Sequence, residues 1–171
     1  RGLSIFGNTT GLQVASGIST FQAITATTVN SILVGQGANS VATNTTVGSG
    51  SLDANTTGSN NAVLGYNAAT ANTTGQNNTA VGSVSLATNT TGSHNTALGM
   101  GALNANTTAS NNTAVGRSAL SSNTTGDQNS ALGALALNQN TTASNNVAIG
   151  HYSLQQNTTG AQNVAVGAFA L

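Results

Sequence analysis

Apolar and polar residues recur along this chain in a seventeen-residue repeat. The triplet Asn-Thr-Thr marks each copy, and it begins at Asn55, Asn72, Asn89, Asn106, Asn123, Asn140 and Asn157. Counted from that Asn as position 1, the repeat reads N-T-T-[GA]-x-x-N-x-A-[VLI]-G-x-x-[AS]-L-x-x, and a degenerate first copy covers residues 38–54. Repeats of this length indicate stacked structural units rather than a single central core.

The period argues against a helical repeat. Seventeen residues would advance an α-helix by about 4.7 turns, so an apolar stripe would rotate by roughly 100° at each repeat. Gly, Asn and Thr, which are frequent here, also disfavour helix. We therefore predict an all-β chain, folded as a parallel β-roll or β-solenoid in which each repeat forms one coil.

Two columns of aliphatic residues, at positions 10 and 15, are the candidates for the core. An offset of five would direct them to opposite faces of one straight strand, so we expect a turn at the Gly of position 11 and two short strands per coil. Both columns would then face a thin interior. The position-10 column is Val47, Leu64, Val81, Leu98, Val115, Leu132, Ile149 and Val166, and the position-15 column includes Leu52, Leu86, Leu103, Leu120, Leu137 and Leu154. The turn glycines are Gly48, Gly65, Gly82, Gly99, Gly116, Gly133, Gly150 and Gly167.

A column of Asn at position 7 is the clearest polar feature. Stacked amides can form a hydrogen-bonded ladder, and Asn also tolerates the left-handed backbone conformation of a turn. We expect a structural role for this column rather than a ligand site. Its members are Asn44, Asn61, Asn78, Asn95, Asn112, Asn129, Asn146 and Asn163.

Residues 1–34 do not follow the repeat, so we predict two parts: a β-rich shaft or collar over 1–34 and a repeat domain over 35–171. Each thin coil holds only about two aliphatic residues, whereas ordering each residue costs roughly 1–2 kcal/mol of backbone entropy. Because burial returns only about 25 cal/mol per Å², a single rod would be marginal. We therefore expect a parallel homo-oligomer.

Short motifs within the repeat carry a family resemblance. The chain reads N-N-V-A-I-G at 145–150, Q-N-V-A-V-G at 162–167 and N-S-V-A at 39–42, which resembles the repeats of YadA-like trimeric adhesin heads. The unit NTTGQNNTAVGSVSL at 72–86 is similar to repeats of phage and algal-virus tail fibres, and residues 7–29 are similar to marine phage fibre shafts. The resemblance implies a left-handed β-roll assembled as a homotrimer.

Composition and charge exclude most chemistry. The chain has no Cys, two Lys or Arg and two Asp or Glu, so it lacks a thiolate metal site and the basic surface that nucleic acid or anionic lipid requires. Asp53 and Asp127 occupy different columns, as do His94 and His151, so neither pair forms a catalytic or metal site within one chain. We expect no enzyme activity, no metal and no cofactor, and no apolar run long enough for membrane insertion.

Two surface features could meet a partner. The residue after each repeat Gly varies widely, which indicates a solvated row that a host-surface receptor or glycan could contact, and its large members are Tyr66, Met100, Arg117 and His151. The Asn-Thr-Thr triplets at Asn8, at Asn44 and from Asn55 to Asn157 also match the N-glycosylation sequon, although we interpret them first as turn and ladder residues.

Ice binding by Thr columns is disfavoured because the adjacent Thr56 and Thr57 would point in opposite directions.

These observations favour an extracellular, non-catalytic structural role. The leading hypothesis is a segment of a trimeric viral or phage fibre that supports attachment to a host surface, on a virion or a cell-surface appendage. A bacterial trimeric adhesin head and a self-assembling extracellular filament are the alternatives. The chain starts at Arg1 and ends at Leu171 inside a repeat, so we also expect it to be a piece of a longer protein.

Overall fold

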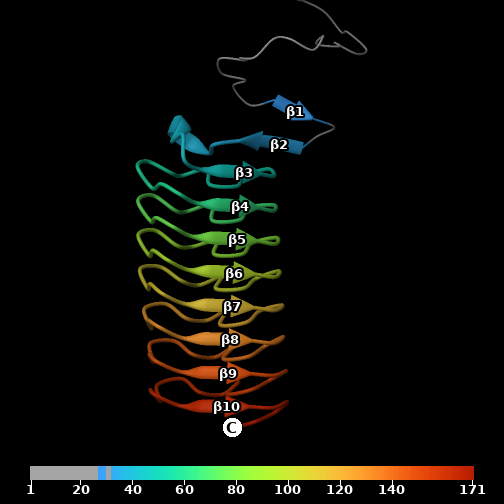
Figure 1. The fold of residues 1–171 in the computed structure, drawn as a ribbon, viewed down its shortest axis with the longest axis vertical. Coiled ribbons are helices and arrows are strands. Elements are labelled where there is room, and N and C mark those ends of the chain that lie inside the picture. Colours follow the sequence, from blue (N-terminus) through green and yellow to red (C-terminus); the bar gives the residue numbers. More distant parts are fainter. Residues whose placement is uncertain (1–26, 30–31) are drawn as a thin grey trace, which may run out of the picture.

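The repeat folds into a rod of stacked coils, described by a computed structural model over residues 27–29 and 32–171 (Figure 1). Every coil contributes one strand of three residues, and these strands pair in parallel in chain order. The strands are β3 Thr45–Val47, β4 Ala62–Leu64, β5 Thr79–Val81, β6 Thr96–Leu98, β7 Thr113–Val115, β8 Ser130–Leu132, β9 Val147–Ile149 and β10 Val164–Val166. The predicted all-β solenoid, with one repeat in each coil, is confirmed.

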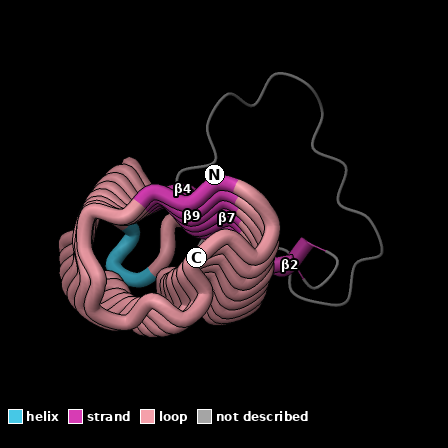
Figure 2. The backbone as a smooth tube through the Cα atoms, turned by 90° about the horizontal axis from the view of Figure 1, so that it is seen from below, coloured by secondary structure: helices cyan, strands magenta, loops and turns pink. Residues whose placement is uncertain are grey.

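Register follows the repeat strictly, so equivalent residues lie directly above one another. Ala97 pairs with Ala80 on one side and with Ala114 on the other, and these are the residues at the same repeat position in the two neighbouring coils. Viewed along the rod, the strands superpose on one side of a closed outline whose remaining sides are loops and turns (Figure 2). Each repeat position therefore becomes a column running the length of the rod.

The prediction of two strands per coil is wrong, because each described coil contains one. After the strand, the chain passes through a Gly with positive φ and then through left-handed residues at positions 13 and 15, such as Ser118 (φ 53°) and Leu120 (φ 52°). Left-handed residues break the extended geometry that a second strand would need. Main-chain hydrogen bonds nevertheless continue between coils here: the Leu120 N–H donates to the Ala136 carbonyl over 2.9 Å.

A short hairpin adds to the same sheet at the end where the repeats begin. Strand β1 (Thr27–Val29) pairs antiparallel with β2 (Ile32–Gly35), and β2 pairs antiparallel with β3. The 3₁₀ turn η1 (Ala38–Ser40) then lies across the end of the stack (Figure 2), where the Ala38 N–H donates to the Leu52 carbonyl over 3.1 Å. It covers the first coil. The rest of the predicted collar over 1–34 lies outside the described residues.

The core contains the leucine column of position 15, the inward residue of each strand at position 9, and small residues at position 14, such as Ala102 and Ala119, which are fully buried. The leucine column at position 15 is fully buried from Leu52 to Leu137, and Leu154 is 8% exposed. The second column is position 9, the middle residue of each strand, whose side chain points inward; we call it the alanine column. Its members are Thr46, Val63, Ala80, Ala97, Ala114, Ala131, Ala148 and Ala165, and none is more than 6% exposed.

The buried leucines adopt the left-handed conformation that bulky residues usually avoid. Their φ angles lie near 50° from Leu52 to Leu154. This conformation costs about 1–2 kcal/mol per residue, while burying a Leu side chain stabilises by about 1.5–3 kcal/mol. Burial therefore outweighs the backbone strain. The described part of the chain contains no helix that could span a membrane.

The Gly of position 11 is required for two independent reasons. Its φ lies between 128° and 147° in the eight coils, and a Cβ added to Gly82 would lie 2.7 Å from the carbonyl carbon of Gly99 in the next coil. Real Cβ atoms do not approach backbone that closely. Both the turn conformation and the coil spacing thus depend on this Gly, and it stands where the repeat predicts a turn.

Candidate interaction surface

The aliphatic column of position 10 lies on the outside of the strands. Leu64, Leu132, Ile149 and Val166 are 47%, 49%, 39% and 68% exposed, and the remaining members, Val47, Val81, Leu98 and Val115, are partly exposed. The prediction that this column belongs to the core is therefore wrong for all eight residues. We call it the outer column.

Strand alternation explains the error. Successive side chains of a strand point to opposite faces, so in a strand of three residues the first and third point the same way. Here the middle residue points inward, as in Thr113–Ala114–Val115, where Ala114 is fully buried. The interior already holds the leucine column, and the inward residue opposite it is Ala in six of the eight strands, β5 to β10. The large residue of position 10 is consequently left outside.

The first strand residue, at position 8, shares this outer face and changes character along the rod. It is Thr in β3, β5, β6 and β7, Ala in β4, Ser in β8, and Val in β9 and β10. No charged side chain stands at position 8 or 10 in the eight strands. The face is most apolar at the last two coils, where Val164 and Val166 are 74% and 68% exposed. A continuous apolar stripe of this kind is typical of an interaction surface.

The predicted Asn column of position 7 forms a buried ladder. The Oδ1 of Asn95 accepts from the main-chain N–H of Asn112 over 3.0 Å, and its Nδ2 donates to the Ala109 carbonyl over 2.9 Å. The same pattern begins at Asn44 and is repeated from coil to coil. The left-handed turn residue is its neighbour at position 6, for example Asn111 with φ 61°, and not the ladder residue itself.

A second amide ladder lies at position 1, the first residue of the Asn-Thr-Thr triplets, which the sequence predicts as turn and ladder residues. Asn106 donates from Nδ2 to the Oδ1 of Asn89 over 2.7 Å and to the Ala109 carbonyl over 3.0 Å. The Ala109 carbonyl thus accepts from Asn95 and Asn106 together, which fills both of its lone pairs. Its signal in the sequence is the strict recurrence of Asn at the start of the triplet. These two ladders join neighbouring coils in the buried part of the rod.

The row that follows each Gly is on the surface, as expected. Tyr66 and Met100 are 60% and 52% exposed, and Arg117 and His151 are also exposed. Toward the last coil this row meets an aromatic cluster. The rings of Tyr152 and Phe169 stack with centroids 5.3 Å apart, and the His151 ring lies 4.2 Å from that of Tyr152.

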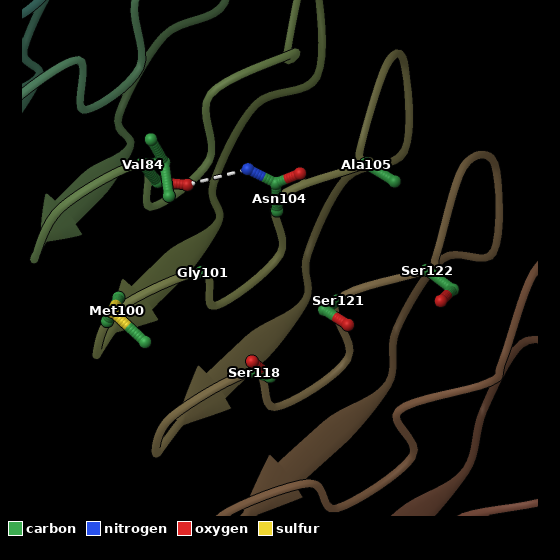
Figure 3. Close-up of a pocket in the computed structure, with 8 residues that line it drawn as sticks. All are labelled: Val84, Met100, Gly101, Asn104, Ala105, Ser118, Ser121 and Ser122. Carbon is green, nitrogen blue, oxygen red and sulfur yellow. Dashed lines mark hydrogen bonds between the residues drawn. The ribbon is translucent and has the colours of Figure 1, made fainter.

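A shallow hollow opens on the flank of the coils that contain β5, β6 and β7 (Figure 3). It arises because small residues at positions 13, 16 and 17, such as Gly101, Ser118 and Ser121, follow one another there. The Asn104 side chain crosses it to donate to the Val84 carbonyl over 2.9 Å. Its lining is Val84, Met100, Gly101, Asn104, Ala105, Ser118, Ser121 and Ser122, none of which is charged.

Within residues 27–29 and 32–171, no group of three or more His, Cys, Asp or Glu side chains lies together. His94 contacts Asn77 of the preceding coil, with 3.2 Å between Nε2 and Nδ2, and His151 lies in the aromatic cluster. The outer column is accordingly the apolar surface feature that continues through all eight strands, β3 to β10. Compared with models of protein families, with curated proteins and with solved structures, the chain matches none.

Proposed function

We propose that this chain is a non-catalytic structural segment of a trimeric viral or phage fibre, wound left-handed, that supports attachment to a host surface from a virion or other extracellular appendage. The observation that carries the proposal is the exposed outer column. Such a stripe is unfavourable in water, and it has the same length as the rod itself.

The regularity of the outer column favours association with further copies of this chain. Coils are spaced by about 4.8 Å, so eight coils present one aliphatic side chain per step along about 38 Å. A parallel copy offers an identical column with identical spacing. Since no charged residue interrupts positions 8 and 10 of β3 to β10, copies can approach without burying a charge.

Threefold symmetry and left-handed winding come from the resemblance to YadA-like heads and fibre repeats. The motif N-N-V-A-I-G at 145–150 covers β9, in which Val147 and Ile149 both point outward. These residues stand in the most apolar part of the outer face. We expect the three outer columns to meet along a common axis, with the contact row of Tyr66, Met100, Arg117 and His151 available to a host receptor or glycan.

The oligomeric state of the chain in solution tests this proposal. Sedimentation equilibrium at micromolar concentration should give the mass of three chains, and replacing Leu98→Lys together with Leu132→Lys should give the mass of one. Each Lys would place a charge in the apolar contact, where it is costly to bury. Far-UV circular dichroism should stay unchanged, because neither side chain contributes to the core.

Ser83→Lys with Ala134→Lys is the matched control. Both residues stand at position 12 on the surface row, so the control adds the same charge beside the outer face but not on it. It should leave the trimer intact. A monomeric wild-type chain, or a trimer that survives the outer-column lysines, would contradict the proposal.

A bacterial trimeric adhesin head is the second candidate, favoured by the same motif at 145–150 and by the same stacked coils. The full-length gene separates the two. A self-cleaving chaperone or a tail-attachment domain after the repeats would support the fibre, and a membrane anchor would support the adhesin.

A further inference from the structure

The described part of the chain holds ten Asn-x-Thr sequons, and the fold divides them into two groups. Eight are the Asn-Thr-Thr triplets at Asn44 and from Asn55 to Asn157. Two others overlap the repeat differently: Asn77-Asn78-Thr79 and Asn111-Asn112-Thr113 begin at position 6. The sequon needs an Asn side-chain nitrogen that a glycan can occupy, so the surroundings of that atom decide between the groups.

The side chains of the triplet asparagines from Asn44 to Asn140 are inaccessible in the folded rod, and the Nδ2 of the part-buried Asn157 donates to the Asn140 Oδ1 and the Gly160 carbonyl. From Asn55 to Asn140 those of position 1 are fully buried, and Asn44 is 3% exposed. In Asn89 the Nδ2 donates both to the Asn72 Oδ1 over 2.7 Å and to the Gly92 carbonyl over 2.9 Å, so both of its hydrogens are used. A sugar on this nitrogen would remove one bond and would have no space between the coils.

Asn77 and Asn111 have the opposite surroundings. Both side chains are exposed, both residues are left-handed (φ 56° and 61°), and they stand on the same column two coils apart. The Asn77 side chain meets His94 at the surface, and the main chain of Asn111 is held by the Ser93 carbonyl. A glycan at either Nδ2 would extend into solvent and disturb neither ladder.

We propose that Asn77 and Asn111, and not the repeated triplets, are the N-glycosylation sites that the folded rod can carry. The donor is a glycan linked to a lipid diphosphate. The Asn Nδ2 forms a bond to the anomeric carbon as the anomeric C–O bond breaks, the amide gives up one proton, and the lipid diphosphate leaves with the electron pair. This inference does not rest on the fibre proposal.

The chain supplies its own controls at position 6. Asn60 and Asn145 are exposed on the same column, but Ala62 and Val147 stand where the sequon needs Thr. They should remain unmodified. Thr79→Val and Thr113→Val remove one sequon each, and Val is the native residue at this position in β9 and β10, so the coil should fold unchanged.

The test is to secrete the chain from a eukaryotic cell, isolate the soluble rod, and release glycans enzymatically in H₂¹⁸O so that each former site is read as ¹⁸O-labelled Asp by peptide mass spectrometry. We expect label at Asn77 and Asn111, and none from Asn55 to Asn140. Each Val variant should lose one of the two glycans. Label at a buried triplet Asn in the soluble rod, or no label at both Asn77 and Asn111, overturns the proposal.

Modification of the nascent chain at the triplets could keep the wild-type chain inside the cell. A second variant avoids this by changing the third residue of every triplet to Ala, as in Thr74→Ala and Thr108→Ala, including Thr46→Ala at Asn44 and Thr10→Ala at Asn8. It should be secreted with glycans at Asn77 and Asn111. A secreted, folded variant without glycans at Asn77 and Asn111 overturns the proposal as well.

Discussion

The leucine column and the outer column are built from the same kind of residue, yet they lie in opposite environments. Leu120 is fully buried, whereas Leu132 in the next coil is 49% exposed. Both columns recur once in every repeat, and both are aliphatic in nearly every coil. The difference between them is therefore not one of hydrophobicity, and it must come from the backbone.

The backbone decides because so short a coil encloses very little space. The three-residue strand directs one side chain inward, and the left-handed turn after the Gly directs the Leu toward it. With the leucine column in place, the inward residue opposite it never exceeds Val or Thr in size, and the strand residue beside it faces out. A narrow solenoid thus places one of its two columns of large aliphatic residues on the surface, where that column is available for association.

The largest difference in the free energy of unfolding is expected between two variants, each of which shortens one residue in one of the two columns. Leu120→Ala should lower the free energy of unfolding by roughly 2–5 kcal/mol, because it removes buried methyl groups and leaves a cavity between coils. Ala is compatible with this backbone, since Ala69 occupies the same position with φ 46°. Leu132→Ala should change the stability of the single chain by less than about 0.5 kcal/mol.

Chemical denaturation followed by circular dichroism measures both changes. The measurements are made in the Leu98→Lys, Leu132→Lys variant, which we expect to be monomeric, so that contacts between copies do not contribute to stability. Because position 132 is already Lys in this variant, Val115→Ala serves there as the outer-column substitution. Equal losses at positions 120 and 115 in that background would mean that the two columns are equally buried and would contradict the structure.

An intermediate effect is expected for the amide ladders, compared with an Asn on the surface. Asn106→Gln lengthens a fully buried side chain and displaces its bonds to Asn89 and Ala109, so we expect a loss of about 1–3 kcal/mol. Asn111→Gln is the matched control, because Gln128 and Gln162 hold the same left-handed position in other coils. It should leave the denaturation midpoint unchanged. If the denaturation midpoint falls equally in both variants, the ladder hydrogen bonds of Asn106 add no stability beyond the effect of lengthening an Asn side chain to Gln.

The sequence predicts the environment of a column when that environment follows from residue type and spacing. It does not predict the environment when this depends on the direction in which the backbone points the side chain. The period, the leucine column, the turn at Gly82 and its equivalents, and the ladder through Asn95 follow from residue type and spacing. The outward direction of Val115 does not, since Val suits either face of a strand. The signal was in its neighbour: position 9 never exceeds Val in size, which a tight interior requires, while position 10 varies freely among Val, Leu and Ile. Nothing in a Leu predicts the left-handed conformation of Leu120.

The smallest effect tests how closely the interior is filled. Ala114→Val adds two methyl groups on the inward side of β7, opposite the leucine column, and we expect a loss of about 1 kcal/mol from overpacking. Val63 occupies the same position in β4, but the leucine-column residue of that coil is Ala69, so the larger and smaller residues have exchanged places.

Combining Ala114→Val with Leu120→Ala reproduces that exchange. The double variant should be more stable than the sum of the two single losses predicts, as a double-mutant cycle by denaturation would measure. Additive losses would mean that positions 9 and 15 do not share one interior, and the comparison between inner and outer columns would then need a different physical basis.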